Sequence, residues 1–343
     1  MQSRRVIHVV GCHAAGEVGD VVVGGVAPPP GETLWSQSRA LQEQGDLRDF
    51  LLNEPRGGVF RHVNILVPPK DPQAQMGNLI FEPETAPPMS GSNTICVTTV
   101  LLETGILPMQ EPETELLLEM PGGVVRVRAR CERGRVTEVT FTNLPSFVDR
   151  MDAPLEVPGL GTLTVDIAFG GDSFVVADAR ALGFAIAPDE AAELRDTGMA
   201  IAHAAQEQLG FTHPTLDGMN EITFCLLAGP VESRSDCRHG THAVAIRPGK
   251  LDRSPTGTGV SARLALMHAR GDVAVGERLA FHSVLGSTFY GEIAETTMLG
   301  ERPAVIPQIS GRAWITETRQ LLLADDDPWP SGYRLADTWP PEP

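Results

Sequence analysis

Two short turns of small, hydroxyl-bearing residues are the parts of this chain best suited to chemistry. Ser90 begins the sequence Ser-Gly-Ser-Asn and Thr256 begins the sequence Thr-Gly-Thr-Gly, and an apolar stretch follows each turn. A glycine stands at the same distance beyond each turn, at Gly105 and Gly271. Because a helix N-terminus exposes unpaired N–H groups and a partial positive charge, each turn is suited to binding a carboxylate. The repeated pattern suggests a two-fold pseudosymmetric molecule with one site between its halves.

The hydroxyl groups of the two turns predict a reaction at the carbon next to a bound carboxylate. If two helix termini hold the carboxylate, Ser90 and Thr256 flank that carbon on its two faces. A group on each face of a carbon acid is what inversion or elimination chemistry requires. Serine and threonine before a helix are also ordinary N-caps, each worth about 0.5–2 kcal/mol. The duplication of the turn leaves both interpretations open.

The composition is that of an acidic globular chain long enough for two domains. The chain has 343 residues, of which 42% are hydrophobic and 21% are charged, and these fractions are ordinary for a globular protein. The 35 glycines and 28 prolines indicate many turns and favour a strand-rich or mixed fold. The net charge of −17 disfavours nucleic acid and anionic membranes as partners.

The cysteines and the N-terminal residues indicate a cytoplasmic protein. Five cysteines are odd in number and irregularly spaced, which fits reduced thiols better than a disulfide framework. The apolar run after Arg4 and Arg5 is too short for the core of a signal peptide, and no stretch has the length of a membrane span. We therefore expect a cytoplasmic localisation and no membrane partner.

The order of predicted elements also repeats. Residues 6–10 and 21–23 read as strands around a polar turn, and a helix is predicted over residues 33–52. A second strand, glycine turn and strand begin near residue 162, and a helix follows from Pro188 to about residue 209. The halves are therefore expected to divide near residues 150–160. The tail from Asp325 is expected to be an irregular surface extension.

Longer motifs around the two turns carry a family resemblance. Residues 88–94 and 252–259 resemble the first and second catalytic motifs of the proline racemase family. The resemblance extends over roughly residues 6 to 318. Further similar pieces are His13 with Gly16 and Glu17, residues 53–57, residues 143–147, and Gly170 with Gly171.

The resemblance implies an α/β (α+β) fold of the diaminopimelate epimerase type. Such a fold has two pseudosymmetric domains, each with a curved sheet or barrel around a central helix. The central helices would span about 94–104 and 260–270, with both N-termini in the cleft between the domains. The implied domains are 1–155 and 156–311, with residues 312–343 as a candidate completion of the first and the active site between them.

The two catalytic positions depart from the pair of cysteines that acts in this family as two opposed bases. They are Ser90 and Thr256 here, and family members with threonine at the second position are trans-3-hydroxy-L-proline dehydratases. A threonine hydroxyl is a much poorer acid than a thiol, so inversion at Cα should fail. The resemblance therefore implies a hydro-lyase that converts trans-3-hydroxy-L-proline through a 2-pyrroline enamine to 1-pyrroline-2-carboxylate, without a cofactor.

The resemblance also assigns a role to each residue of the two turns. Ser90 would be the base that removes the Cα proton, and Thr256 would be the residue at the second face. Asp252 would bind the ring nitrogen of the substrate. Ser92 stands where racemases and epimerases carry histidine. The residues that would bind the substrate carboxylate are Gly91, Ser92, Gly257 and Thr258.

Two other functions are compatible with the same motifs. One is a hydroxyproline 2-epimerase, and the other is a non-catalytic relative that binds an imino acid. The group Cys237, His239 and His242 has metal-ligand types but lacks the fourth ligand of a structural zinc site, so no metal is predicted. Lys70 and Lys250 are the two lysines of the chain, and no phosphate-binding pattern accompanies either. A homodimer is a candidate assembly.

Overall fold

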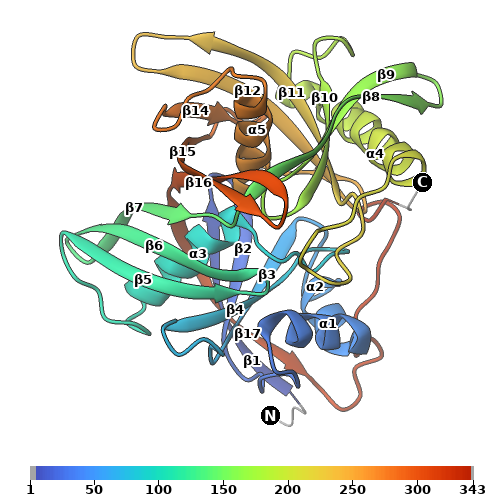
Figure 1. Cartoon of the computed structure of the whole chain (residues 1–343). Helices are drawn as coiled ribbons and strands as arrows, with labels where there is room; N and C mark the ends of the chain where they lie inside the picture. Colours follow the sequence, from blue (N-terminus) through green and yellow to red (C-terminus); the bar gives the residue numbers. More distant parts are fainter. Residues whose placement is uncertain (1–4, 341–343) are drawn as a thin grey trace. The chain divides into compact units, whose positions relative to one another are not determined.

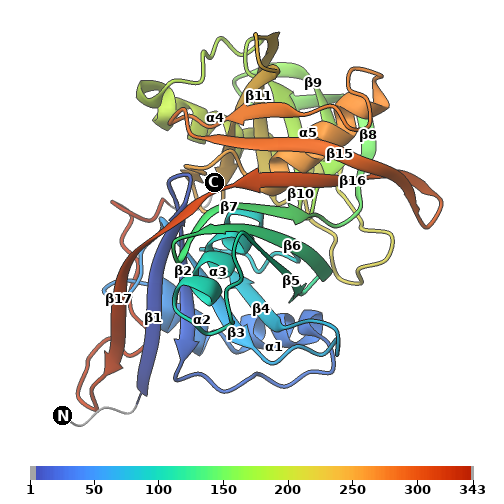
Figure 2. The same cartoon turned by 90° about the vertical axis from the view of Figure 1, so that its left-hand side faces the viewer.

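The computed structural model describes residues 5–340 and divides into two compact units. Within these residues, one unit contains residues 5–141 and 311–340, and the other contains residues 142–310. The division that the sequence suggested between residues 155 and 156 falls inside strand β8, Ser146–Val157. Strand β17, Ala313–Leu323, belongs to the first unit because it pairs antiparallel with β1 along its length, as Figure 2 shows.

The strands of the first unit form a curved sheet (Figure 1), and from β1 to β6 the pairings alternate in direction. Strands β1 and β2 pair antiparallel, β2 and β3 parallel, β3 and β4 antiparallel, β4 and β5 parallel, and β5 and β6 antiparallel. Strand β7, Arg135–Thr142, follows. The bounds are β1 Arg5–Ala14, β2 Glu17–Gly24, β3 Arg61–Val67, β4 Met76–Phe81, β5 Glu113–Met120 and β6 Gly123–Glu132.

Helix α3, Gly91–Glu103, is the central helix of the first unit. It contacts β1, β2 and β17, and every residue from Gly91 to Leu102 is buried. Its sequence GSNTICVTTVLLE has no charge before its last residue, and a helix without a polar face is stable only when it is enclosed. The sheet therefore wraps around α3, and it fixes the position of the residues at the start of that helix.

The predicted helix over residues 33–52 is two helices in the structure. Helix α1 spans Leu34–Gln44, and α2 spans Asp46–Leu52. Gly45 separates them with φ of 70°, and its N–H bonds the carbonyl of Leu41. Glycine adopts this left-handed conformation without steric cost, which ends α1.

The second unit repeats the pairing pattern of the first. Strands β8 and β9 pair antiparallel, β9 and β10 antiparallel, β10 and β11 parallel, β11 and β12 antiparallel, β12 and β14 parallel, and β14 and β15 antiparallel. This matches the series from β17 through β6, so the predicted duplication is confirmed. The bounds are β9 Gly161–Phe169, β10 Ser173–Asp178, β11 Phe224–Ser233, β12 Arg238–Ile246, β13 Lys250–Leu251, β14 Leu279–His282, β15 Thr288–Leu299 and β16 Arg302–Gly311.

Helix α5, Gly257–Ala269, has the same place in the second unit that α3 has in the first. It contacts β8, β9 and β15 and is buried from Gly257 to Met267. Helix α4, Ala191–Gln208, packs on β11 and β12 after the short 3₁₀ turn η1, Pro188–Glu190. None of the helices within residues 5–340 is long and apolar enough to cross a membrane.

The C-terminal segment is irregular, but it is not the simple surface extension that the sequence suggested. Arg56 donates to the carbonyls of Leu322 and Trp329, and Arg334 donates to Asn53 Oδ1. Trp339 is only 4% exposed. The segment therefore buries an aromatic side chain and covers part of the first unit.

Candidate functional site

Ser90 lies directly before α3, and its hydroxyl does not cap that helix. Its backbone is extended, with φ of −145°, and its side chain makes no capping hydrogen bond. Instead, Ser90 Oγ accepts a hydrogen bond of 2.9 Å from Nδ2 of Asn93. Both residues are buried, with Asn93 fully so. The hydroxyl at this turn is therefore held by an amide donor.

Buried polar side chains from two strands lie behind Ser90. Asn93 accepts from Asn64 Nδ2 at 2.6 Å, and its own Nδ2 lies 3.3 Å from Nδ1 of His62. His62 is also close to Glu17, at 3.2 Å from Nε2, and to Glu82, at 3.5 Å from Nδ1. All of these residues are buried.

The sequence interpretation assigned no role to Asn93, His62 or Asn64, but it contained a signal. His62 and Asn64 are polar residues two positions apart in the apolar strand β3, so they lie on the same face of the sheet. Polar side chains are rarely fully buried unless they are paired. An alternating polar pair inside an apolar strand therefore indicates a buried hydrogen-bond network.

Thr256 precedes α5 in a backbone conformation that is unusual for its residue type. Its φ is 56° and its ψ is 96°, a region that β-branched residues rarely adopt. Its side chain makes no capping bond. Its Oγ1 donates to Oδ2 of Asp252 at 2.6 Å, and its N–H donates to Ser254 Oγ at 3.0 Å. Asp252 Oδ1 in turn accepts the N–H of Ser254 at 2.8 Å, which ties the turn together.

His242 contacts the backbone of this second turn. Its Nε2 bonds the carbonyl of Pro255, the residue before Thr256, and its Nδ1 lies 3.4 Å from Nη1 of Arg263. Burial, with a smaller contribution from the Arg263 guanidinium, lowers the pKa of His242 to about 3. The imidazole is therefore neutral at pH 7, with Nε2–H as the donor to Pro255. The sequence raised His242 as a metal-ligand type, and the structure places it against the turn instead.

The structure groups the sequence-predicted site residues into two half-sites. Ser90, Gly91 and Ser92 form the start of α3, and Asp252 joins Thr256, Gly257 and Thr258 at the start of α5. The first intrahelical bonds run from Thr94 N to Ser90 O and from Val260 N to Thr256 O. The N–H groups of the first three residues of each helix therefore have no acceptor within the helix. Each half-site thus offers backbone donors beside a hydroxyl.

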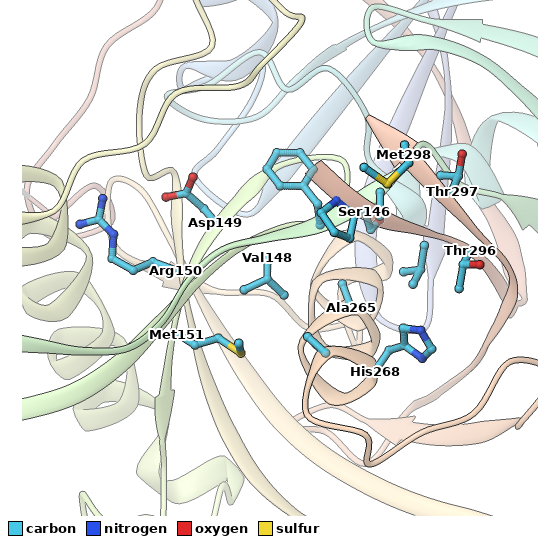
Figure 3. A pocket seen from close by; sticks show the side chains of 15 residues that line it. Ser146, Val148, Asp149, Arg150, Met151, Ala265, His268, Thr296, Thr297 and Met298 are labelled. Carbon is cyan, nitrogen blue, oxygen red and sulfur yellow. The ribbon is translucent and has the colours of Figure 1, made fainter. Parts of the chain in front are cut away.

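Two other features of the second unit lie apart from these half-sites. Asp236, Cys237 and His239 bring one ligand atom each to within 4.8 Å of one another. A cavity of about 620 Å³ lies among β8, α5, β15 and β16, with an apolar lining that includes Val148, Met151 and Met298 (Figure 3). No sequence-predicted site residue lines that cavity.

The chain is similar in sequence and fold to known proteins. The family model described as Proline racemase matches residues 9–334. A hydroxyproline epimerase from Agrobacterium vitis, solved with bound trans-4-OH-L-proline, is 36% identical, with a TM-score of 0.94 over 99% of this chain and 97% of that chain. A probable proline racemase from Agrobacterium radiobacter K84, solved with bound carbonate, is 36% identical, with a TM-score of 0.92 over 98% of each chain.

More distant structures share the fold alone. A PhzF-family phenazine biosynthesis protein from Bacillus anthracis is 12% identical, with a TM-score of 0.56 over 93% of this chain and 100% of that chain. A similar likeness holds for an epimerase-like protein from Pseudomonas aeruginosa at 15% identity. The mixed α/β fold of the diaminopimelate epimerase type, which the family resemblance implied, is confirmed.

Proposed function

Because the chain belongs to the proline racemase family, we propose that it acts on a hydroxyproline and removes the Cα proton with Ser90 as the base. The main proposal is the dehydration of trans-3-hydroxy-L-proline. It requires the Ser90 half-site and the Thr256 half-site to act on the same substrate molecule. Backbone N–H groups at the starts of α3 and α5 would hold the carboxylate, and Asp252 would bind the ring nitrogen.

The stereochemistry of this substrate suits a reaction on one face. In the trans isomer the C3 hydroxyl is on the ring face opposite the carboxylate, which is the face that carries the Cα hydrogen. Ser90 would take that proton, and the electron pair of the broken C–H bond would form the Cα–C3 double bond. The C3–O bond breaks and the departing hydroxide becomes water on protonation. The resulting enamine tautomerises to 1-pyrroline-2-carboxylate, and no proton donor on the other face is needed.

The observation that carries dehydration is the hydrogen bond from Thr256 Oγ1 to Asp252 Oδ2, at 2.6 Å. Epimerisation needs a group that returns a proton to Cα on the second face. The hydroxyl proton of Thr256 points to a carboxylate, and a threonine hydroxyl is a weak acid. The second half-site is therefore better suited to binding than to proton delivery.

Hydroxyproline 2-epimerisation is the second candidate, and the similarity to the Agrobacterium vitis epimerase with bound trans-4-OH-L-proline favours it. In that reaction one hydroxyl would take the Cα proton and the other would return a proton on the opposite face. Where Thr256 Oγ1 takes the proton, its own proton would move to Asp252 and Ser90 would deliver a proton. The two hydroxyl groups would then act as the acid and the base on opposite faces of Cα. The third candidate is a relative that binds an imino acid without turning it over, and the absence of cysteine at both positions keeps it open.

One experiment separates the three candidates. The protein is incubated in deuterated water with trans-3-hydroxy-L-proline and, separately, with trans-4-hydroxy-L-proline. Dehydration predicts pyrroline formation from the first substrate and no inversion of the second. Inversion with deuterium at Cα of the second substrate, without pyrroline from the first, would replace dehydration by epimerisation. Binding of either compound without exchange or turnover would leave only the non-catalytic candidate.

A further inference from the structure

Three buried asparagines form a chain of hydrogen bonds that ends on Ser90. Asn78 Nδ2 donates to Asn64 Oδ1 at 3.0 Å, Asn64 Nδ2 donates to Asn93 Oδ1 at 2.6 Å, and Asn93 Nδ2 donates to Ser90 Oγ at 2.9 Å. None of the three asparagine side chains is exposed to solvent. The chain starts on β4, passes through β3 and ends at the first turn of α3.

The direction of this chain is fixed by the partners of each amide. A side-chain amide has two N–H donors and one carbonyl oxygen. Asn93 uses one donor on Ser90 Oγ and directs the other at Nδ1 of His62, while its oxygen accepts from Asn64. Turning the Asn93 amide over would place its NH₂ against the NH₂ of Asn64. Asn64 is fixed in the same way, because its Nδ2 also donates to the carbonyl of Asp20 at 3.3 Å.

His62 closes the network on its other side. Its Nδ1 lies 3.3 Å from Asn93 Nδ2, and its Nε2 lies 3.2 Å from Glu17 Oε1. Both His62 and Glu17 are 1% exposed. Glu82 Oε1 lies 3.5 Å from the same Nδ1, so a carboxylate lies beside each ring nitrogen. Asn93 therefore contacts Asn64 on one side and His62 on the other, and its Nδ2 faces Ser90 Oγ.

A donor at this position matters for a serine that acts as a base. A serine hydroxyl has no useful alkoxide population at neutral pH. Hydrogen bonds in a chain polarise one another, and a donor aimed at an oxygen that becomes negative is strongest in the charged state. An amide cannot itself accept the proton. Its contribution is to stabilise charge, while the hydroxyl proton of Ser90 leaves to water and the Cα proton then bonds to the same oxygen.

On the basis of the proposed function, we propose that Asn93, oriented by Asn64 and His62, is the positioning residue that stabilises negative charge on Ser90 Oγ. The network makes no contact with the substrate in this proposal. It acts on the base alone, so it lowers the barrier to proton removal and leaves substrate binding unchanged. Asn64 and Asn78 act through Asn93, and their effects decrease along the chain.

The test is a double-mutant cycle that changes the acidity of the base. Asn93→Ala, Asn93→Asp and Asn64→Leu are made in the natural chain and in Ser90→Cys. Rates of Cα deuterium exchange, kcat and KM are measured. In the natural chain, loss of the Asn93 donor should lower kcat by roughly 10²–10³-fold with KM within a few-fold, as for one oxyanion donor. In Ser90→Cys the loss should be at least tenfold smaller, because a thiol with a pKa of about 8.5 ionises with far less help.

Thr98→Val is the matched control. Thr98 is a buried polar residue on the same helix, and its hydroxyl bonds Thr94 O rather than the amide chain. It should leave exchange, kcat and KM unchanged in both backgrounds. Equal losses for Asn93→Ala in the two backgrounds, or a rise in KM that accounts for the loss, would overturn the inference. Asn93→Asp keeps the shape of the side chain but replaces its amide donor. It therefore tests the inference if Asn93→Ala fails to fold.

This outcome is separate from the fate of the proposed function. If Ser90→Ala retains turnover, Ser90 is not the base and the proposed function fails. If Ser90→Ala is inactive but Asn93→Ala and Asn93→Asp are not, the base assignment stands and the amide chain has no catalytic role. If Ser90→Cys shows no exchange at all, Asn93→Asp in the natural chain provides the test. A lowered kcat with unchanged KM then supports the inference, and an unchanged kcat overturns it.

Discussion

The two half-sites share a local pattern and differ in the direction of one hydrogen bond. Each places a hydroxyl residue directly before a helix that begins with glycine and is buried around its circumference. Ser90 Oγ accepts from the Asn93 amide, whereas Thr256 Oγ1 donates to the Asp252 carboxylate. An oxygen that faces a donor is suited to carrying negative charge, and a hydroxyl bonded to a carboxylate is not. One duplicated architecture therefore supports two chemically unequal positions.

The backbone conformations of the two turns also differ. Ser90 has an ordinary extended conformation, while Thr256 has φ of 56°. A non-glycine residue in such a region costs of the order of 1–3 kcal/mol. The bonds from Thr256 to Asp252 and Ser254, and the bond from His242 to Pro255, hold the second turn in that conformation. The second half-site is thus the more constrained one.

The largest expected effect comes from removing the two hydroxyls in turn. Ser90→Ala should lower turnover of trans-3-hydroxy-L-proline by about 10³-fold or more, since a general base contributes roughly 10²–10⁴-fold. Thr256→Val keeps the size of the side chain and should lower it far less, because no proton needs to move on the second face. Steady-state pyrroline formation measures both. Equal losses in the two variants would mean that the half-sites are equivalent after all.

A smaller effect is expected from Asp252→Asn. The change removes the negative charge that would bind the ring nitrogen and that accepts the Thr256 hydroxyl. We expect kcat/KM to fall by about 10²-fold, in line with the loss of a charged partner, with KM carrying most of the change. Asp189→Asn, on an exposed turn, is the matched control. If kcat falls instead and KM stays constant, Asp252 takes part in the chemical step, as the epimerase candidate requires.

Two glycines that face the central helices should respond differently to alanine. A Cβ on Gly170 would meet backbone atoms of α5, the carbonyl of Thr258 at 2.1 Å and the N of Ala262 at 2.4 Å. A Cβ on Gly19 would meet the side chain of Asn93, with Oδ1 at 2.7 Å. Gly170→Ala should therefore lower the free energy of unfolding by about 2 kcal/mol.

Gly19→Ala should cost less stability than Gly170→Ala, because a side chain can move more easily than a helix backbone. It should lower kcat even under conditions in which the protein stays folded, since it displaces Asn93. Urea unfolding and pyrroline formation separate the two effects. Gly105→Ala tests a glycine with no neighbour within 4 Å and a φ of 73°, and it should affect stability alone.

The smallest expected effect concerns pH and the neutral histidine of the second half-site. Since the folded pKa of His242 is about 3 and its ordinary value is 6.5, the unfolded chain binds more protons between these values. Stability should therefore fall as the pH falls through this window, by up to about 1.4 kcal/mol per pH unit from this group. In His242→Gln, whose amide can still donate to Pro255, the decline between pH 6.5 and 5 should be less steep. An identical slope in both proteins by urea unfolding would show that His242 is not held neutral by the fold.

What the sequence determined by itself was local. A hydroxyl residue, glycine and an apolar stretch predict a helix start, and the same pattern at Ser90 and Thr256, with the repeated strand order, indicated the duplication. The family motifs then implied the fold, which is confirmed. The break at Gly45 was also local, but the apolar spacing on both sides of it concealed it.

Only the tertiary structure decided what the two hydroxyls are bonded to. The partners of Ser90 include Asn93 on α3 and, through it, Asn64 and Asn78 on strands β3 and β4. The support of Thr256 includes His242 on β12. Hydrogen-bond direction depends on which groups distant strands bring to the same place, and a linear pattern of residue types does not encode that placement. The repeated turn is readable from the sequence, and the chemical inequality of its two copies is a property of the folded units.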